Sequence, residues 1–360
     1  MQTTFTASLT DDNRVLRAMG ASAIAHLAKI SPRVDPIARQ LVQGSRAQSG
    51  AIKEAQLNAL QNVVRMAGSS LSKEQLDDVF DLFTGMVDDK DEGFRALSAL
   101  GIGACLRVVG EEDASGEIED ALAGDDDPDQ DDYEFRADAL LDGLDEDEAI
   151  VHGRVQTLSA AVRFSLGCAA VADQAEEIEA ALEAAAKCKV PVIRASAAIG
   201  LACLLGRCGR TPDACGVPMA ELKEGELDTA VKAAIELAPK ALACLVGLAG
   251  DTSSDVRSAV AVGFKRYAKA APEHLRDVGM ATAGGAVLEL AHEKNALVKH
   301  RGERAAMHAF AVHRDDGQKY RLTAGASLAP EMSSRMGDLA RSLARRTVAA
   351  DSDDEDNELV

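Results

Sequence analysis

The sequence has 360 residues, of which 47% are hydrophobic and only 3% aromatic, and it contains no tryptophan. A chain of this length can bury a substantial core, and its many alanine and leucine residues favour closely packed helices over a β-sandwich or barrel. The net charge of -20 disfavours nucleic-acid binding as a general property, so we expect no direct contact with DNA.

The charge is spread unevenly along the chain. Residues 71–190 hold 32 acidic against 9 basic side chains, whereas residues 255–346 hold 10 against 16. The mildly basic first 70 residues and residues 255–346 could still contact phosphate groups locally. Seven cysteines form no Cys-x-x-Cys pair and polar residues follow Met1, which indicates a reducing cytoplasm. Because the apolar runs fall far short of the ~20 residues that span a bilayer, we expect no membrane segment.

One pattern returns along the chain: a turn with acidic residues, glycine or proline, then a basic residue beside an apolar one, then an alanine-rich segment. The basic residues are Arg17, Lys53, Arg95, Arg154, Arg194, Arg257 and Lys299. Most of their spacings lie near the ~40 residues of two-helix HEAT or armadillo repeats, and the two long ones contain insertions. The sequence therefore predicts an all-α superhelix, a HEAT/armadillo-type solenoid of two-helix repeats, in which each helix pair shares its core with the next.

The first helix of each predicted pair starts beside one of these basic residues. In the first of them an apolar stripe is expected to pack inward; it consists of Val15, Met19, Ala23, Leu27 and Ile30. Small residues such as Ala96, Ala99 and Gly101 should let adjacent helices approach closely. Second helices are expected at about residues 35–46, 73–87, 174–188, 229–248 and 273–292. Pro239 should bend or split the fourth of these.

We expect the solenoid to cover residues 1–314, with two inserts. These are an acidic insert at 124–134 and a loop insert at 206–226, both solvated because neighbouring acids repel one another and bury nothing. Residues 315–347 are expected to form a C-terminal extension with a basic helix over 330–347. Residues 348–360 read as a disordered acidic tail.

Catalytic and metal-binding motifs are missing from the sequence. His292-Glu293 is the single His-Glu pair, whereas a di-iron hydroxylase built from HEAT repeats, one alternative, needs several. Cys203, Cys208 and Cys215 are spaced by five and seven residues, a weak match to a metal site. No phosphate-binding loop, nucleophile elbow or kinase signature occurs. We therefore predict a protein that is no enzyme and holds neither cofactor nor metal.

The repeated bases have a structural interpretation. Arg95, Arg194 and Arg257 each follow an apolar residue, and we expect them to form a ladder with an aspartate of the neighbouring repeat. Arg17 has two interpretations, because together with Arg14 it places positive charge at the positive end of a helix dipole, at a cost of ~0.3–1 kcal/mol each. Either Asp11 and Asp12 supply the compensating charge within the chain, or an acidic partner protein does.

The segment Gln2–Arg14, continued by Arg17 and by Arg33-Val-Asp-Pro36, resembles the general-control translational activator family. These are giant HEAT-repeat proteins that activate the kinase phosphorylating initiation factor two α. The likeness continues in order and approximate spacing through His152-Gly-Arg154, Ser253–Arg257 and Asn295–Val298. It covers about residues 1–312 and corresponds to the C-terminal portion of the family.

The resemblance implies a non-enzymatic, cytoplasmic scaffold that binds and activates this kinase at stalled ribosomes during amino-acid starvation and stress. It implies the RWD domain of the kinase as a partner, with Arg17 and the adjacent Arg14 as binding residues. The ribosome and an ATP-binding-cassette protein are further implied partners. It also implies that residues 1–10 are half of a helix pair, which would leave an uncapped apolar face, and that further repeats precede this chain.

A generic HEAT adaptor, either karyopherin-like or microtubule-associated, is the alternative function on the same fold. Residues 71–190 could mimic the acidic inner surface of a karyopherin. Tubulin-binding repeats usually present a tryptophan at a loop tip, and this chain has none.

Overall fold

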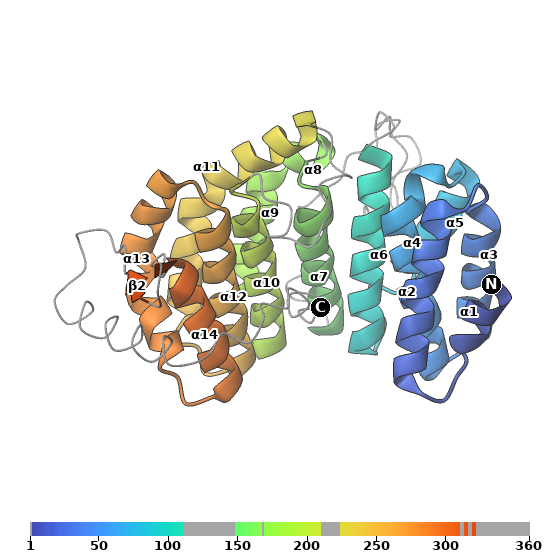
Figure 1. Ribbon diagram of the computed structural model, residues 1–360, viewed down its shortest axis with the longest axis horizontal. Coiled ribbons are helices and arrows are strands. Elements are labelled where there is room, and N and C mark those ends of the chain that lie inside the picture. The colour runs from blue at the N-terminus through green and yellow to red at the C-terminus, as the bar shows by residue number, and fades with distance from the viewer. Residues whose placement is uncertain are drawn as a thin grey trace. The chain divides into compact units, whose positions relative to one another are not determined.

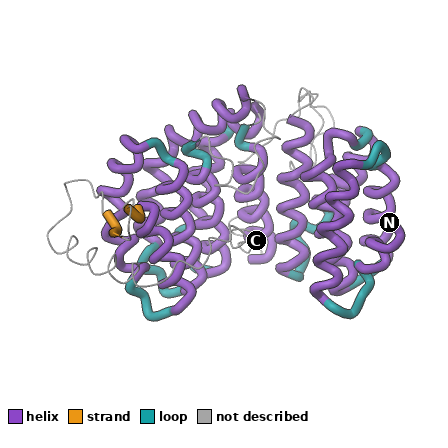
Figure 2. The backbone as a smooth tube through the Cα atoms, in the orientation of Figure 1, coloured by secondary structure: helices purple, strands orange, loops and turns teal. Residues whose placement is uncertain are grey.

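The computed structural model describes residues 2–110, 148–167, 169–209, 224–309, 313–315 and 319–321. Most of these residues are helical, as Figures 1 and 2 show. The chain divides into two units, Met1–Gln174 and Ala175–Val360. Within each unit, antiparallel helices are stacked in the manner of HEAT and armadillo repeats, which confirms the predicted α-α superhelical fold class.

The first unit holds eight described α-helices and one short 3-10 helix, Gly68–Ser70. They are α1 (Gln2–Ser8), α2 (Arg14–Ile30), α3 (Asp35–Ala47), α4 (Gly50–Ala67), α5 (Lys73–Thr84), α6 (Glu92–Gly110), α7 (Glu148–Ser165) and α8 (Ala169–Asp173). The first helices α2, α4, α6 and α7 each contact the next in the series, and the second helices α3 and α5 pack on α4 and α6 (Figure 1).

The second unit repeats this arrangement. Its helices are α9 (Ala175–Ala185), α10 (Pro191–Gly206), α11 (Glu224–Leu248), α12 (Ser254–Ala270), α13 (Glu273–Ala291) and α14 (Ala296–Ala309). The first helices α10, α12 and α14 contact one another in turn, while α11 contacts both α9 and α13. All five second helices predicted from the sequence are thus present as α3, α5, α9, α11 and α13.

Turn chemistry fixes where the helices begin. The side chains of Asn13, Ser72 and Ser253 cap α2, α5 and α12 by accepting a backbone N–H of the first turn. Prolines stand in the first turn of α3 and α10, where the missing N–H costs nothing. The repeated boundary between turn and first helix therefore follows from local sequence.

Small residues bring neighbouring helices together, as the sequence predicts. A Cβ atom on Gly101 of α6 would overlap the ring of Phe83, which is fully buried, so only glycine allows this close contact. At Gly103 a Cβ would lie 2.9 Å from the backbone oxygen of Ala160 on α7. The cores accordingly consist largely of alanine, leucine and valine.

The apolar stripe predicted on α2 does not pack inward. Met19 is 63% exposed and Ile30 is 79% exposed, while Gly20, Ala21, Ile24, Ala25 and Ala28 form the buried side of this helix. The reason is that α1 and α4 pack on the alanine-rich side, and no described helix covers the stripe. Of the five stripe residues, Val15, Met19 and Ile30 are exposed, and Ala23 and Leu27 are half-buried.

Two further departures concern secondary structure. Pro239 does not split its helix, since α11 is continuous from Glu224 to Leu248 and contacts α9, α10, α12 and α13, while a bend at Pro239 stays a prediction. A two-stranded antiparallel hairpin of β1 (His313–Asp315) and β2 (Lys319–Arg321) stands where no strand is predicted. Its formation depends on pairing between strands of only three residues each, which leave a weak periodic signal.

Several predicted segments lie outside the described residues. They are the acidic insert at 124–134, residues 210–223 of the loop insert, the basic helix at 330–347 and the acidic tail at 348–360. The domain boundaries proposed from the sequence remain predictions. Among the described helices, none has the combined length and apolar content needed to cross a membrane.

Candidate interaction site at the helix starts

The arginines at the helix starts share one local contact, which we call the turn clamp. Through Nη1, each donates to the two backbone oxygens that lie six and five residues before it. The distances are 2.7 and 3.0 Å for Arg17, 2.7 and 3.1 Å for Arg95, 2.9 and 2.8 Å for Arg194, and 2.6 and 3.1 Å for Arg257. The clamp ties each turn to the helix that follows it, and it satisfies carbonyl groups that no helix N–H can reach.

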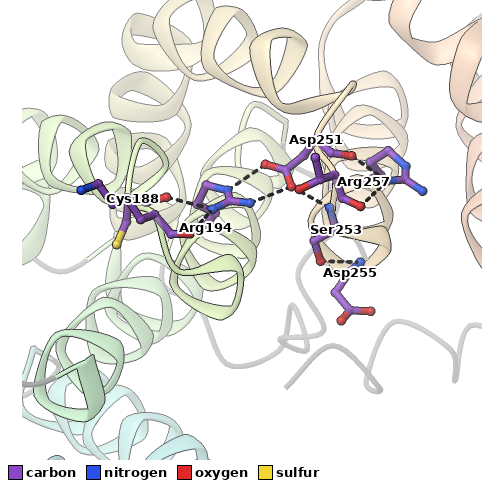
Figure 3. A network of polar contacts seen from close by, with 8 residues as sticks. Cys188, Arg194, Asp251, Ser253, Asp255 and Arg257 are labelled. Atoms are coloured by element: carbon purple, nitrogen blue, oxygen red, sulfur yellow. Dashed lines mark hydrogen bonds and ion pairs between the residues drawn. The ribbon is translucent and has the colours of Figure 1, made fainter.

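A second edge of the guanidinium reaches the next repeat. Arg194 donates from Nε to Asp251 Oδ2 at 2.7 Å and from Nη2 to Asp251 Oδ1 at 2.9 Å, across 57 residues of sequence (Figure 3). The two side chains are 13% and 9% exposed. Arg194 and the backbone N–H of Ser253 hold the pKa of Asp251 below its ordinary value. This two-point geometry is the strong form of an ion pair between side chains.

Two other arginines make the equivalent contact with different partners. Arg257 pairs with Glu293 at 3.0 Å, and Arg95 Nη2 lies 3.1 Å from His152 Nδ1. Glu293 stands six residues before Lys299, as Asp251 stands six before Arg257. The predicted pairing with an aspartate of the neighbouring repeat is therefore confirmed for Arg194, whereas Arg257 reaches a glutamate and Arg95 a histidine of the next repeat instead.

His152 is the partner that the sequence did not indicate. It is 2% exposed, and burial together with the charge of Arg95 lowers its pKa, while Glu92 acts in the opposite direction. Arginine can only donate, so the imidazole accepts at Nδ1 in its neutral form. The two residues are 57 positions apart. Only the alignment of successive helix starts could have suggested the pair.

Among the described residues, Arg17 makes the turn clamp but lacks the second contact, to an acceptor side chain of the next repeat, that Arg95, Arg194 and Arg257 make. Its turn clamp donates to the backbone oxygens of Asp11 and Asp12, so these two residues meet Arg17 through their backbone and not through an ion pair of their carboxylates. Within the described residues no side chain accepts from the other nitrogen atoms of its guanidinium. The position six before Lys53 is Ala47, which has no acceptor side chain, and Lys53 itself lies over the Phe94 ring at 4.7 Å.

Arg14 lies one helical turn before Arg17 at the start of α2 and is exposed. No partner for its side chain occurs in the part of the chain that the structure describes. The structure therefore brings both predicted binding residues to one helix start.

The residues considered for metal binding have other roles. His292 Nδ1 lies 2.7 Å from the backbone oxygen of Leu288, and Glu293 is engaged by Arg257. Cys203 accepts from Arg266 at 3.1 Å, and Cys208 donates to the backbone oxygen of Ala234 at 3.5 Å. Cys215 lies outside the described residues. No cluster of metal-ligating side chains occurs among those described.

Comparison with known proteins identifies a related family. Residues 35–141 match the family described as stalled ribosome sensor GCN1-like, HEAT repeats. The chain is 29% identical over 168 residues to the stalled ribosome sensor GCN1 of Homo sapiens, which is 46% of this chain and 6% of that protein. It is 30% identical over 124 residues to the eIF-2-alpha kinase activator GCN1 of Saccharomyces cerevisiae, which is 34% of this chain and 5% of that one.

Among solved structures, a designed armadillo repeat protein in complex with a (KR)4 peptide is 14% identical with a TM-score of 0.39, covering 75% of this chain and 98% of that chain. The alignments with the human and yeast GCN1 proteins span only 6% and 5% of those much longer proteins. Residues 35–141 are thus similar to the GCN1-like HEAT-repeat family, and the chain is similar in part to a C-terminal portion of GCN1.

Proposed function

We propose that this chain is a non-enzymatic, cytoplasmic scaffold that binds and activates a kinase of initiation factor two α at ribosomes. The proposal follows from the names of its relatives, a stalled ribosome sensor and an eIF-2-alpha kinase activator. The RWD domain of the kinase is the partner proposed for this region, with the ribosome and an ATP-binding-cassette protein as further partners. Activation of this kinase is expected to regulate translation during amino-acid starvation and stress.

The observation that carries the proposal is the open guanidinium edge of Arg17. Asp251, Glu293 and His152 fill this edge in the equivalent arginines, whereas in Arg17 it faces no acceptor among the described residues. A carboxylate of a partner could take the position on Arg17 that Asp251 takes on Arg194. Since the turn clamp already holds the guanidinium in place, such a partner would meet a preorganised fork of donors.

Arg14 adds a second positive charge one turn away, on the same side of the helix. It is exposed and would act on the partner through charge more than through fixed geometry. We therefore assign the main binding role to Arg17 and an accessory role to Arg14.

The test is a pull-down of the kinase RWD domain with the full chain and its variants. We expect Arg17→Ala to weaken binding by about tenfold or more, as is usual when a fork of charge-assisted donors is lost. Arg17→Lys should also bind weakly, because lysine keeps the charge but not the planar fork. Arg39→Ala, which removes an exposed arginine from α3, serves as the matched control and should bind normally.

Thermal unfolding of the same variants separates binding from folding. Arg17→Ala should lower the melting temperature much less than Arg194→Ala does, because it loses the turn clamp of one helix start but no contact with a neighbouring repeat within the described residues. Undiminished binding of this variant would refute the assignment, and so would a loss of helical structure large enough to explain the lost binding. If the chain isolated from stressed cells carries neither the kinase nor ribosomal proteins with it, the result would instead favour a generic HEAT adaptor.

A further inference from the structure

The turn between α3 and α4 carries a serine at the place where the turn between α13 and α14 carries an acid that binds an arginine. Ser49 stands two residues after the end of α3, as Glu293 stands two residues after the end of α13. Glu293 receives Arg257 from the first helix of the preceding repeat. Arg17 belongs to the first helix that precedes Ser49, so Ser49 occupies the corresponding place relative to Arg17.

The Ser49 hydroxyl is exposed and takes part in no hydrogen bond within the described part of the chain. Ser49 is the N-cap residue of α4, but its side chain does not cap the helix, whereas those of Asn13 and Ser253 cap α2 and α12. Gly50 follows with a φ of 57°, and a Cβ atom there would meet no atom within 4 Å, so the turn is open to solvent. A modifying enzyme can therefore reach this hydroxyl without unfolding the helices around it.

A phosphate on Ser49 would supply the anion that this turn lacks. No acidic residue occurs between Arg46 and Lys53 in the sequence. Counted in bonds from Cα, the terminal oxygens of a phosphoserine lie where those of a glutamate lie, so the modified serine resembles Glu293 in length. The phosphate carries about −1.5 to −2 charges at pH 7 and three acceptor oxygens, which suit the planar donor fork of an arginine.

Arg17 is the cation best placed to receive this phosphate. Its turn clamp already fixes the guanidinium, so little conformational freedom is lost when a second acceptor binds. The neighbouring cations are engaged, because Arg46 pairs with Asp78 at 2.8 Å and Lys53 lies over the Phe94 ring. Arg17 is half-buried, which screens such a pair from solvent better than a fully exposed position would.

We propose that Ser49 is a phosphorylation site and that its phosphate binds the open edge of Arg17. A protein kinase transfers the γ-phosphoryl group of ATP to Ser49 Oγ. The Oγ–P bond forms as the bond from the γ-phosphorus to the bridging oxygen of ATP breaks, and the hydroxyl proton is released with ADP. The phosphate then joins the start of α4 to Arg17 of α2, as Glu293 joins the start of α14 to Arg257 of α12. The modification uses, within the chain, the donors that an outside acidic partner would need, a consequence that rests on the function proposed for Arg17.

The first experiment tests whether the folded chain is a substrate. Arg46 stands three residues before Ser49, a spacing that calmodulin-dependent protein kinases select, so such a kinase and ATP are incubated with the full chain. Trypsin releases residues 47–53, in which Ser49 is the only hydroxyl side chain, and mass spectrometry then locates the modification without ambiguity. We expect most of this peptide to carry one phosphate. Phosphorylation of a synthetic peptide of residues 42–53 but not of the folded chain would overturn the proposal.

The second experiment tests the contact with Arg17. Phosphoserine is placed at position 49 of the full chain during translation, phosphorus NMR follows its second ionisation, and circular dichroism shows that each variant is folded. The pKa of a phosphoserine that binds no cation is ~6, and we expect a value about 0.5–1 lower in this chain, because Arg17 favours the doubly charged form. Arg17→Ala should return the pKa to ~6, and Arg17→Lys should keep only part of the difference, since lysine lacks the fork.

Phosphoserine at position 72 is the matched control. Ser72 is the exposed N-cap residue of α5, so its phosphate also lies at a helix start, but this helix is a second helix outside the arginine ladder. The titration of this phosphate should be the same in the chain with Arg17 and in the Arg17→Ala variant. An equal pKa for the phosphate at position 49 with and without Arg17 would overturn the proposal, and so would an equally large dependence on Arg17 at position 72.

A pull-down separates this inference from the proposed function. If the RWD domain binds the unmodified chain, phosphoserine at position 49 should weaken binding as much as Arg17→Ala does, by about tenfold or more. If the RWD domain does not bind at all, the proposed function fails, while the phosphate titration still decides whether Ser49 and Arg17 are coupled. Undiminished binding to a chain whose phosphate titrates in dependence on Arg17 would overturn the regulatory consequence, since the partner would then not use the open edge of Arg17.

Discussion

At the scale of single residues, Arg194 combines a turn clamp with a nearly buried ion pair. Arg194→Ala leaves the Asp251 carboxylate and two backbone oxygens without their donor, so we expect it to lower the free energy of unfolding by about 2–4 kcal/mol. Lys240→Ala is the comparison, because its pair with Glu176 is exposed and screened by solvent and should change the stability far less. Urea unfolding followed by circular dichroism measures both, and similar losses in the two variants would contradict this account.

His152 makes the stability of the same ladder depend on pH. Its pKa in the folded chain lies below the ~6.5 of an unfolded histidine, so the unfolded state takes up the proton more readily. The contribution of the neutral imidazole is therefore complete above about pH 6.5 and is lost as the pH falls toward the lowered folded-state value.

We expect His152→Gln to remove part of this acid sensitivity, because glutamine can accept from Arg95 without titrating. The measurement is urea unfolding of the full chain at several pH values between about 7.5 and 5.5. A variant whose stability falls with acid as steeply as that of the unmodified chain would show that other groups dominate the dependence.

At the scale of helices, the sequence was informative wherever local chemistry decides the structure. The spacing of the basic residues located the first helices, and the turn residues located their starts. The sequence did not indicate which side of each helix is buried or which residue of the next repeat pairs with each arginine. The stripe from Val15 to Ile30 is apolar at helical spacing, yet the alanine-rich side with Ile24 is the buried one, because small residues permit closer helix contact. The partner His152 depends on which repeats become neighbours, which no local signal encodes.

Glycines within the helices differ in role, and the structure separates them. A Cβ on Gly302 of α14 would lie 2.5 Å from the backbone nitrogen of Ala291, whereas one on Gly247 of α11 would meet no atom within 4 Å. We expect Gly247→Ala to stabilise the chain by about 0.5–1 kcal/mol through helix propensity, and Gly302→Ala to destabilise it by about 1–3 kcal/mol because α13 and α14 must separate. Thermal unfolding of the two variants provides the comparison, and equal signs would disprove it.

At the scale of the whole molecule, cohesion comes from contacts between neighbouring repeats. Each of the three contacts made by Arg95, Arg194 and Arg257 joins one first helix to the start of the next. The stability of such an array is approximately a sum of repeat and nearest-neighbour terms. A broken rung should therefore act locally, while the remaining repeats keep their structure.

Asp251→Asn tests this locality, since it weakens the rung between α10 and α12 without removing volume. In the full chain we expect faster hydrogen exchange in the amides of Pro191–Gly206 and Ser254–Ala270, by about tenfold, with little change in α2 and α4. Arg194→Lys should give the same pattern, because lysine cannot hold the turn clamp and the two-point pair together. A uniform rise in exchange across every described helix would mean that the chain unfolds as one cooperative body, and that the ladder stabilises all repeats at once.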